Sequence, residues 1–228
     1  SRGEKDLVKK AVDIAVKKGI YVIIDWHDHN ASDHVKEASA FFREMAVLYK
    51  NTPNVIFEPY NEPLVNERWE SVKKYSEKIL KVIRGEGAKN LVIVGSPSWS
   101  LDVDAAALDP IKNDPNVAYT LHFYAGSHRD DVREKASFAM ERGLAVFVTE
   151  WGTCLATGDG SVDAEESDLW IDYMDKYKLS WCNWSLNDKD ETCSILKPGA
   201  NPDGGWSDKD LTESGKYVKS KLLQKPKE

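Results

Sequence analysis

The feature that most constrains this chain is a regular alternation of short β-branched runs with longer amphipathic segments. Each apolar run is five to eight residues long, and a helical stripe separates it from the next run. The runs predict strands at 20–27, 54–58, 90–95, 117–124, 144–151 and 179–185. The stripes predict helices at 5–17, 35–49, 69–84, 103–109, 129–142, 165–176 and 211–223. Strands that alternate with helices form parallel sheets with right-handed crossovers, so an α/β fold is expected.

The polar residues of this pattern favour a (β/α)8 barrel over a doubly wound sheet. No Gly-x-Gly-x-x-Gly signature follows any predicted strand, which removes support for a dinucleotide site. Histidine, carboxylate and aromatic residues instead gather at the carboxyl ends of the strands, and those ends converge only in a barrel. No linker or change of composition divides the sequence, so residues 1–228 are expected to form a single catalytic barrel domain.

A complete barrel of this kind has eight strands and about 250 residues. Only six strands are visible, and the sequence starts in a predicted helix. We therefore expect strands 3 to 8 of a barrel, without the N-terminal part that carries the first two strands.

Composition excludes several classes of protein. The net charge is −7, and no basic stripe is present, which argues against a nucleic-acid partner. No apolar run approaches the roughly 20 residues that span a bilayer, so no membrane partner is expected. The eight tryptophans are many for this length, and those at strand ends suit the flat C–H faces of sugar rings.

Two carboxylates suggest the chemistry. The stretch "VIFEPYNEPLVNE" (55–67) ends a buried strand with Glu62, and prolines restrict the backbone on both sides. Glu150 ends another predicted strand. A single glutamate at a strand end is more often a salt-bridge partner or a helix cap. Two of them over one barrel mouth indicate cleavage of a glycosidic bond, in which one carboxyl donates a proton and the other attacks or activates water.

Four motifs in order make the chain resemble glycoside hydrolase family 5, and most closely its bacterial-type endo-β-1,4-glucanases. They are "DWH" (25–27), "NEP" (61–63), "HFY" (122–124) and "TEWG" (149–152), followed by "NWSLNDKDE" (183–191) and "LKPGANPDGGW" (196–206). The resemblance implies that Glu62 is the acid/base and Glu150 the nucleophile of a retaining cellulase. Such a pair lies about 5–5.5 Å apart and forms a covalent glycosyl-enzyme.

The resemblance also implies a set of substrate-binding residues. Asn61 matches the amide that binds the sugar 2-hydroxyl, and Tyr124 matches the phenol that holds the nucleophile. Trp184 matches the stacking platform beside the scissile bond, and Trp99 suits a second platform on the leaving-group side. The other matched binding residues are His27, His122, Lys189 and Glu191. The structural alternatives are a core tryptophan for Trp99 and a solvated loop charge for Lys189.

One departure from the family bears on activity. Family members carry an arginine on the second barrel strand that hydrogen-bonds the nucleophile, and no segment here supplies it. We expect little or no turnover from the isolated 228-residue chain. We also expect a monomer if the missing strands are restored. No cofactor and no metal are required by this chemistry.

Other functions stay open from the sequence alone. The histidines of "DWHDHN", His27 and His29, have the spacing of a metal pair in barrel amidohydrolases. A barrel that retains its aromatic cleft without catalysis would be a glucan-binding module. Within the family, mannan and xylan are alternative substrates to β-glucan.

The three cysteines do not establish the compartment. Their odd number allows one disulfide and a thiol, or three thiols. Cys154 and Cys193 both belong to predicted mouth-side loops and could pair, which would leave Cys182 within a strand. An extracellular location follows only by implication, because polymeric cellulose does not enter cells.

Overall fold

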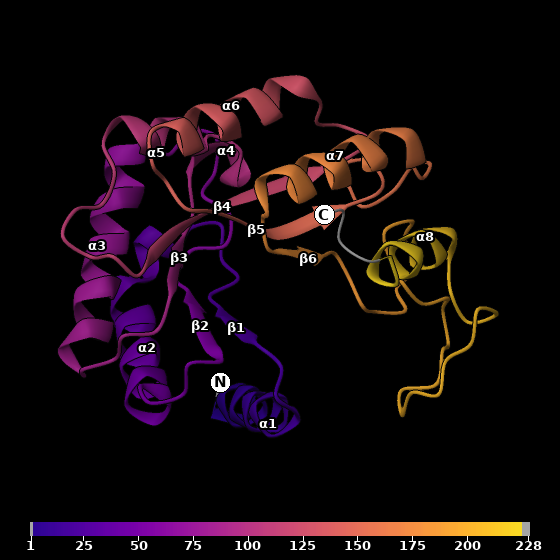
Figure 1. Ribbon diagram of the computed structural model, residues 1–228. Coiled ribbons are helices and arrows are strands. Elements are labelled where there is room, and N and C mark those ends of the chain that lie inside the picture. Colours follow the sequence, from indigo (N-terminus) through magenta and orange to yellow (C-terminus); the bar gives the residue numbers. More distant parts are fainter. Residues whose placement is uncertain (1, 225–228) are drawn as a thin grey trace. The chain divides into compact units, whose positions relative to one another are not determined.

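The computed structural model describes residues 2–224 and contains the predicted alternation of strands and helices (Figure 1). The strands are β1 (Val22–Asp25), β2 (Val55–Glu58), β3 (Val92–Val94), β4 (Val117–Tyr124), β5 (Val146–Gly152) and β6 (Trp181–Asn183). The helices are α1 (Arg2–Lys18), α2 (Val35–Tyr49), α3 (Trp69–Gly85), α4 (Pro97–Ser100), α5 (Val103–Leu108), α6 (Asp130–Glu141), α7 (Ala164–Tyr177) and α8 (Glu213–Leu222), with a 3-10 turn η1 (Ala31–His34).

The order of the strands identifies the fold class. Their order in the sheet is β1-β2-β3-β4-β5-β6, the same as in the sequence, and the registered pairs are parallel. A doubly wound sheet reverses its strand order at a switch point, whereas a barrel adds each new strand to the same side of the previous one. The prediction of an α/β fold of the (β/α)8-barrel type is therefore confirmed.

The chain folds into two compact units, which we describe separately. The first contains residues 1–120 and 138–146, and the second contains residues 121–137 and those from 147 onward. Strands β4 and β5 each contribute residues to both units. The interpretation of the chain as a single catalytic domain stays a prediction.

The core of the first unit lies between β1–β3 and the helices α2 and α3, which run beside these strands (Figure 1). All four residues of β2 are buried, as expected for a strand covered on both faces. The Phe42 ring on α2 meets Phe57 on β2 edge-to-face, with centroids 6.0 Å apart. The buried residues of α2 lie on one helical stripe, at Ala38, Phe42, Met45, Ala46 and Tyr49.

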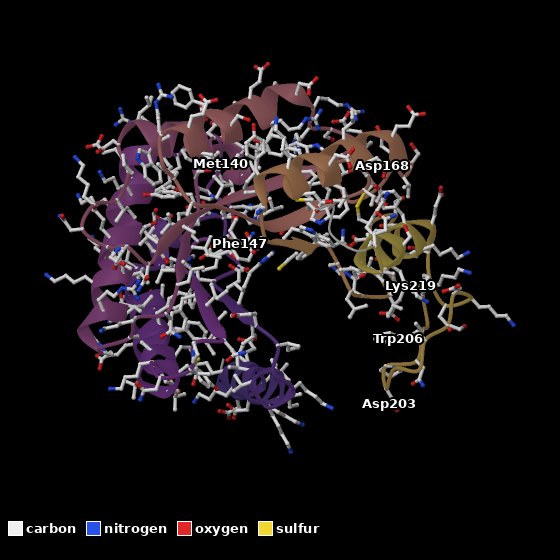
Figure 2. The ribbon with its side chains drawn as sticks, viewed as in Figure 1. Met140, Phe147, Asp168, Asp203, Trp206 and Lys219 are labelled. Carbon is white, nitrogen blue, oxygen red and sulfur yellow. A yellow bond between two sulfur atoms is a disulfide. The ribbon has the colours of Figure 1, made fainter. Side chains whose placement is uncertain are left out.

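The second unit has an aromatic core behind β4, β5 and α7. The Phe123 ring on β4 stacks on Trp170 of α7, with centroids 3.8 Å apart, and lies 5.6 Å from Trp151 of β5. Beyond β6 a long loop leads to α8. Figure 2 shows Trp206 on this loop and Lys219 on α8, and both line an apolar cavity of about 470 Å³.

Most element boundaries differ from prediction by one to three residues, and two differences have a clear cause. β1 starts at Val22, because Ile20 and Tyr21 follow the left-handed Gly19 and their side chains are exposed. α4 was not predicted, since the sequence "SPSWS" (96–100) carries no helical stripe. Within residues 2–224, every helix is too short or too polar to cross a lipid bilayer.

Candidate active site

The carboxyl end of β1 carries His27 and, after a tight turn, His29. The His27 Nδ1 atom lies 2.9 Å from Asp25 Oδ2, and the imidazole is half-exposed. The turn is closed by Asp28 Oδ1, which accepts a hydrogen bond of 2.8 Å from the Asn30 N–H. Partial burial acts to raise the pKa of Asp28, but hydrogen bonds from Asn30, His34 and Trp26 outweigh it and lower the pKa. Asp28 thus presents a stable negative charge beside the two histidines.

The segment 59–63 after β2 carries Asn61 and Glu62. The Asn61 N–H donates to the Trp26 carbonyl over 3.3 Å, which joins this segment to the end of β1. Asn61 is only 3% exposed, and its side-chain Nδ2 has no hydrogen-bond partner among the described residues. The Glu62 side chain is 15% exposed, and its Oε2 lies 3.8 Å from His29 Nε2. A buried amide donor without a partner is costly unless a ligand accepts from it.

Neighbouring side chains fix the backbone on both sides of Glu62. The Tyr60 phenol donates to the His29 carbonyl over 3.1 Å and also to the Glu67 carboxylate. The Tyr75 phenol donates to the Pro59 carbonyl over 2.9 Å. Burial and the Glu67 carboxylate together raise the pKa of the Tyr60 phenol, so it stays a donor.

The turn 96–100 after β3 carries Trp99. Ser98, Trp99 and Ser100 have φ values of 58°, 56° and 61°, a left-handed run that contains no glycine. The Trp99 N–H donates to the Pro63 carbonyl over 2.8 Å. The indole is 41% exposed, so Trp99 is not a core residue.

Within the second unit, Glu150 lies near the end of β5 and is only 8% exposed. The Tyr124 phenol, at the end of β4, donates to Glu150 Oε1 over 2.7 Å. His122 Nδ1 lies 4.0 Å from Glu150 Oε2, while its Nε2 is 2.9 Å from the Thr149 hydroxyl. The short bond from the phenol restricts the carboxylate to one orientation.

The loop after β6 brings three further predicted residues close to one another. The Trp184 N–H donates to the Trp151 carbonyl over 2.8 Å, and the Lys189 ammonium lies 5.9 Å from the centre of the Trp184 ring. Lys189 is an exposed loop residue, and Glu191 Oε1 is buried without a hydrogen-bond partner within residues 2–224. The Glu191 N–H donates to the Lys189 carbonyl over 2.9 Å.

A disulfide links the loops after β5 and β6. Cys154 and Cys193 are bonded, and both are fully buried against Tyr124, with Trp184 packed on the same cluster. This confirms the pairing that the sequence left open, and Cys182 takes no part in it. Gly152 completes the packing, because a β-carbon there would lie 2.4 Å from the Tyr124 ring and 2.8 Å from Cys193 Sγ.

Comparison with known proteins decides the family. Residues 2–190 match the family profile described as Cellulase (glycosyl hydrolase family 5). The chain belongs to glycosyl hydrolase family 5. This confirms the resemblance inferred from the four motifs.

Individual family members are similar along nearly the whole chain. Endoglucanase A of Evansella cellulosilytica is 50% identical over 225 residues, which cover 96% of this chain and 46% of the relative. A solved structure from Cytophaga hutchinsonii is 47% identical with a TM-score of 0.95, and covers 97% of this chain and 72% of that one. The catalytic domain of Thermobifida fusca endoglucanase Cel5A was solved as a variant in complex with cellotetraose. It is 35% identical with a TM-score of 0.92, and the match covers 98% of this chain and 76% of that one. The chain spans about half the length of the curated relatives it matches.

Each unit of this family 5 chain gathers part of the predicted site. In the first unit, the backbone of Trp99 is hydrogen-bonded to Pro63, directly after Glu62. His27 lies at the end of β1 and contacts Asp25. In the second unit, Tyr124 contacts Glu150, and Lys189 lies over Trp184. His27 and His29 contact different carboxylates, which does not support the metal-pair alternative.

Sequence reasoning missed three residues of the site. Thr149 contacts His122, His29 lies beside Glu62, and Ser100 hydrogen-bonds the Asn61 carbonyl. Thr149 directly precedes Glu150 in the motif "TEWG", so the motif offered a signal for it. The spacing of His29 from His27 suggested only a metal pair and not a position beside Glu62, and no spacing distinguishes Ser100 from a loop residue.

Proposed function

We propose that this chain carries the two catalytic carboxyls of a retaining endo-β-1,4-glucanase, with Glu150 as the nucleophile and Glu62 as the acid/base. The Glu150 carboxylate attacks the anomeric carbon as the bond to the leaving oxygen breaks, and Glu62 transfers its proton to that oxygen. Water then attacks the glycosyl-enzyme ester, and Glu62 takes up the proton of the water.

The 2.7 Å bond from the Tyr124 phenol to Glu150 is the observation that carries this proposal. A nucleophile must hold one orientation before the substrate arrives, and a hydrogen bond to a buried carboxylate supplies that restraint. Because the phenol donates to Oε1, the other oxygen is the one we assign to the attack. His122 lies next to Oε2, at 4.0 Å, and is assigned to the sugar on that side.

The Asn61 Nδ2 atom, which has no hydrogen-bond partner within residues 2–224, supports the role of the first unit. This atom is buried beside Glu62 and would donate to the sugar 2-hydroxyl, a contact that strengthens in the transition state. His27 would bind the same glucose, and the exposed Trp99 indole would stack on the leaving-group sugar.

The loop after β6 supports a site for the glucose on the other side of the scissile bond. Trp184 would form the stacking platform, while Lys189 and Glu191 would hydrogen-bond the hydroxyls of the next glucose outward. The Glu191 Oε1 atom without a partner is a ready acceptor for such a hydroxyl.

β-Glucan is the substrate class we assign, since a family relative was solved with cellotetraose. This polymer places the enzyme outside the cell. We propose a monomer with no nucleic-acid or membrane partner.

A single covalent event tests the mechanism without requiring sustained turnover. A 2-deoxy-2-fluoro cellobioside with a dinitrophenolate leaving group traps the glycosyl-enzyme, and peptide mass spectrometry locates the ester. We expect the label on Glu150. We expect Glu62→Gln to be labelled as well, because this leaving group needs no proton, and Glu150→Gln to remain unlabelled.

Other outcomes would change the proposal. A label on another residue would reassign the nucleophile. Binding of cellotetraose by both variants with no label on any form would favour a glucan-binding module without catalysis.

Substrate class and stereochemistry are tested together. Carboxymethylcellulose, β-mannan and xylan are compared side by side, and a chromogenic cellobioside reports which anomer is released first. Preference for carboxymethylcellulose with release of the β-anomer is expected. Preference for mannan or xylan would keep the mechanism but replace the substrate.

A further inference from the structure

We propose that Ser100 is a positioning residue that couples the proton donor Glu62 to the Trp99 platform. The inference rests on the proposed function and extends it. It concerns two segments of the first unit, 59–63 and 96–100, that lie far apart in the sequence and are joined by one side-chain and one main-chain hydrogen bond.

The 96–100 turn donates two hydrogen bonds to the acid segment, one on each side of Glu62. The Ser100 hydroxyl donates to the Asn61 carbonyl over 2.9 Å, directly before Glu62. The Trp99 backbone N–H donates to the Pro63 carbonyl over 2.8 Å, directly after Glu62. Glu62 is therefore bracketed by two bonds to one turn, and Trp99 is held by the same pair.

Ser100 is built into this connection. It is fully buried, and besides donating to Asn61 its hydroxyl lies 3.4 Å from the Ser96 N–H. The hydroxyl thus fixes the start of the turn as well as the acid segment. Burial keeps water from replacing either bond.

Backbone conformation supports a functional reason for this turn. Ser98, Trp99 and Ser100 all adopt left-handed φ values, which non-glycine residues rarely do in succession. Such strain persists only where surrounding contacts enforce it, and it is concentrated at functional sites. Here the left-handed run exposes the Trp99 indole to solvent and directs the Trp99 backbone N–H to the Pro63 carbonyl.

The segments also approach each other closely enough to exclude a side chain. A β-carbon at Gly95 would lie 2.4 Å from the Tyr60 carbonyl oxygen and 3.0 Å from Pro63. The approach is therefore part of the local fold and not a chance contact of two loops.

This connection predicts which leaving groups the enzyme prefers. A leaving group that stacks on Trp99 would hold the 96–100 turn, and through Ser100 it would hold Glu62 on the leaving oxygen. Proton donation should then be most efficient when the leaving group is itself a glucose unit.

Ser98 is a matched control within the same turn. It has the same side chain and a similar φ, but its hydroxyl donates to Asp102 over 2.6 Å, away from the acid segment. The substitutions Ser98→Ala and Ser100→Ala therefore remove the same group from equally strained positions.

Hydrogen exchange tests the coupling without any need for activity. In Ser100→Ala we expect the amides of Tyr60, Asn61, Glu62 and Leu64 to exchange about two- to tenfold faster than in wild type, as expected for loss of one buried hydrogen bond. Ser98→Ala should leave these amides unchanged. Equal exchange of these four amides in the two variants would overturn the proposal.

Kinetics then test whether the coupling affects proton donation to a glucose leaving group. Relative to wild type, Ser100→Ala should lose about tenfold in kcat on cellotetraose, while labelling by the dinitrophenyl 2-fluoro cellobioside should change less than twofold. Equal losses with both reagents would point to a merely structural role and contradict the proposal. If wild type is not labelled at Glu150, the proposed function fails, and the exchange comparison alone decides the coupling.

Discussion

Glu62 lies on an irregular segment of one compact unit, whereas Glu150 lies within strand β5 of the other. Around Glu62 the carbonyls of Asn61 and Pro63 accept hydrogen bonds from the 96–100 turn. Around Glu150 the restraint acts on the carboxylate itself, through the Tyr124 phenol.

The difference matches the two proposed roles. A general acid must present its proton at the leaving oxygen, so a fixed backbone on both sides of it is an advantage. A nucleophile must keep its charge and orientation throughout, so a direct donor to the carboxylate is an advantage. The hydrogen bonds described here act on the backbone around Glu62 and on the side chain of Glu150.

The largest expected effects come from removing each carboxylate. Glu150→Gln should lower turnover by at least about 10³-fold with every leaving group, because no covalent intermediate can form. Glu62→Gln should cost about 10²–10⁴-fold with a glucose leaving group but little with dinitrophenolate. Rates with a series of aryl cellobiosides measure both. The same dependence on the leaving group in the two variants would contradict the assignment of roles.

The next largest effect concerns the disulfide that supports only the Glu150 unit. Cys154→Ala with Cys193→Ala opens a loop closed over a separation of 39 residues, and the chain-entropy relation gives a loss of about 4 kcal/mol in the free energy of unfolding. Urea unfolding under oxidising conditions measures this. Cys182→Ala is the matched control, expected within about 0.5 kcal/mol because Cys182 is exposed. Similar losses in both would show that the disulfide adds no specific stability.

A smaller effect is expected from the donor to Glu150. Tyr124→Phe removes one hydrogen bond to a charged group, worth about 1.5–3 kcal/mol, so kcat should fall by about 10- to 100-fold. Tyr217→Phe is the control, since Tyr217 makes an equivalent bond of 2.6 Å to the exposed Asp168. An unchanged kcat in Tyr124→Phe would remove the distinction between the two carboxylates.

The smallest effect concerns the exposed pair of His34 and Asp28. The hydrogen bond to the Asp28 carboxylate raises the pKa of His34 above its usual 6.5. The pair therefore stabilises the folded state fully below pH 6.5, and this contribution is lost as the pH rises through the folded pKa. Urea unfolding of wild type and His34→Gln should differ at pH 5.5 and converge at pH 9. If the stability difference between wild type and His34→Gln grew with pH, the pairing of His34 with Asp28 would be contradicted.

The regular elements were largely predictable. The bounds of α2 and β4 agree with prediction at both ends, because a helical stripe and an eight-residue apolar run are strong signals. The strand ends also placed Glu62 and Glu150 correctly at the carboxyl edge of the sheet. Local periodicity suffices wherever burial alone selects the conformation.

The connections within the site were not predictable. The left-handed run at Ser98–Ser100 contains no glycine, and its conformation depends on bonds to a segment 35 or more residues earlier. The proximity of His29 to Glu62 likewise depends on the Tyr60 phenol that fixes the His29 carbonyl. Such contacts follow from tertiary structure, and no spacing in the sequence encodes them.

The packing around Gly152 limits how this chain can be engineered. The volume that a methyl group would need is already filled by the Tyr124 ring and a sulfur of the disulfide. In a saturation library at position 152, even alanine would displace the Tyr124 phenol from the Glu150 carboxylate. Randomisation that aims at new substrates should therefore leave this codon untouched and vary the solvent-facing loops instead.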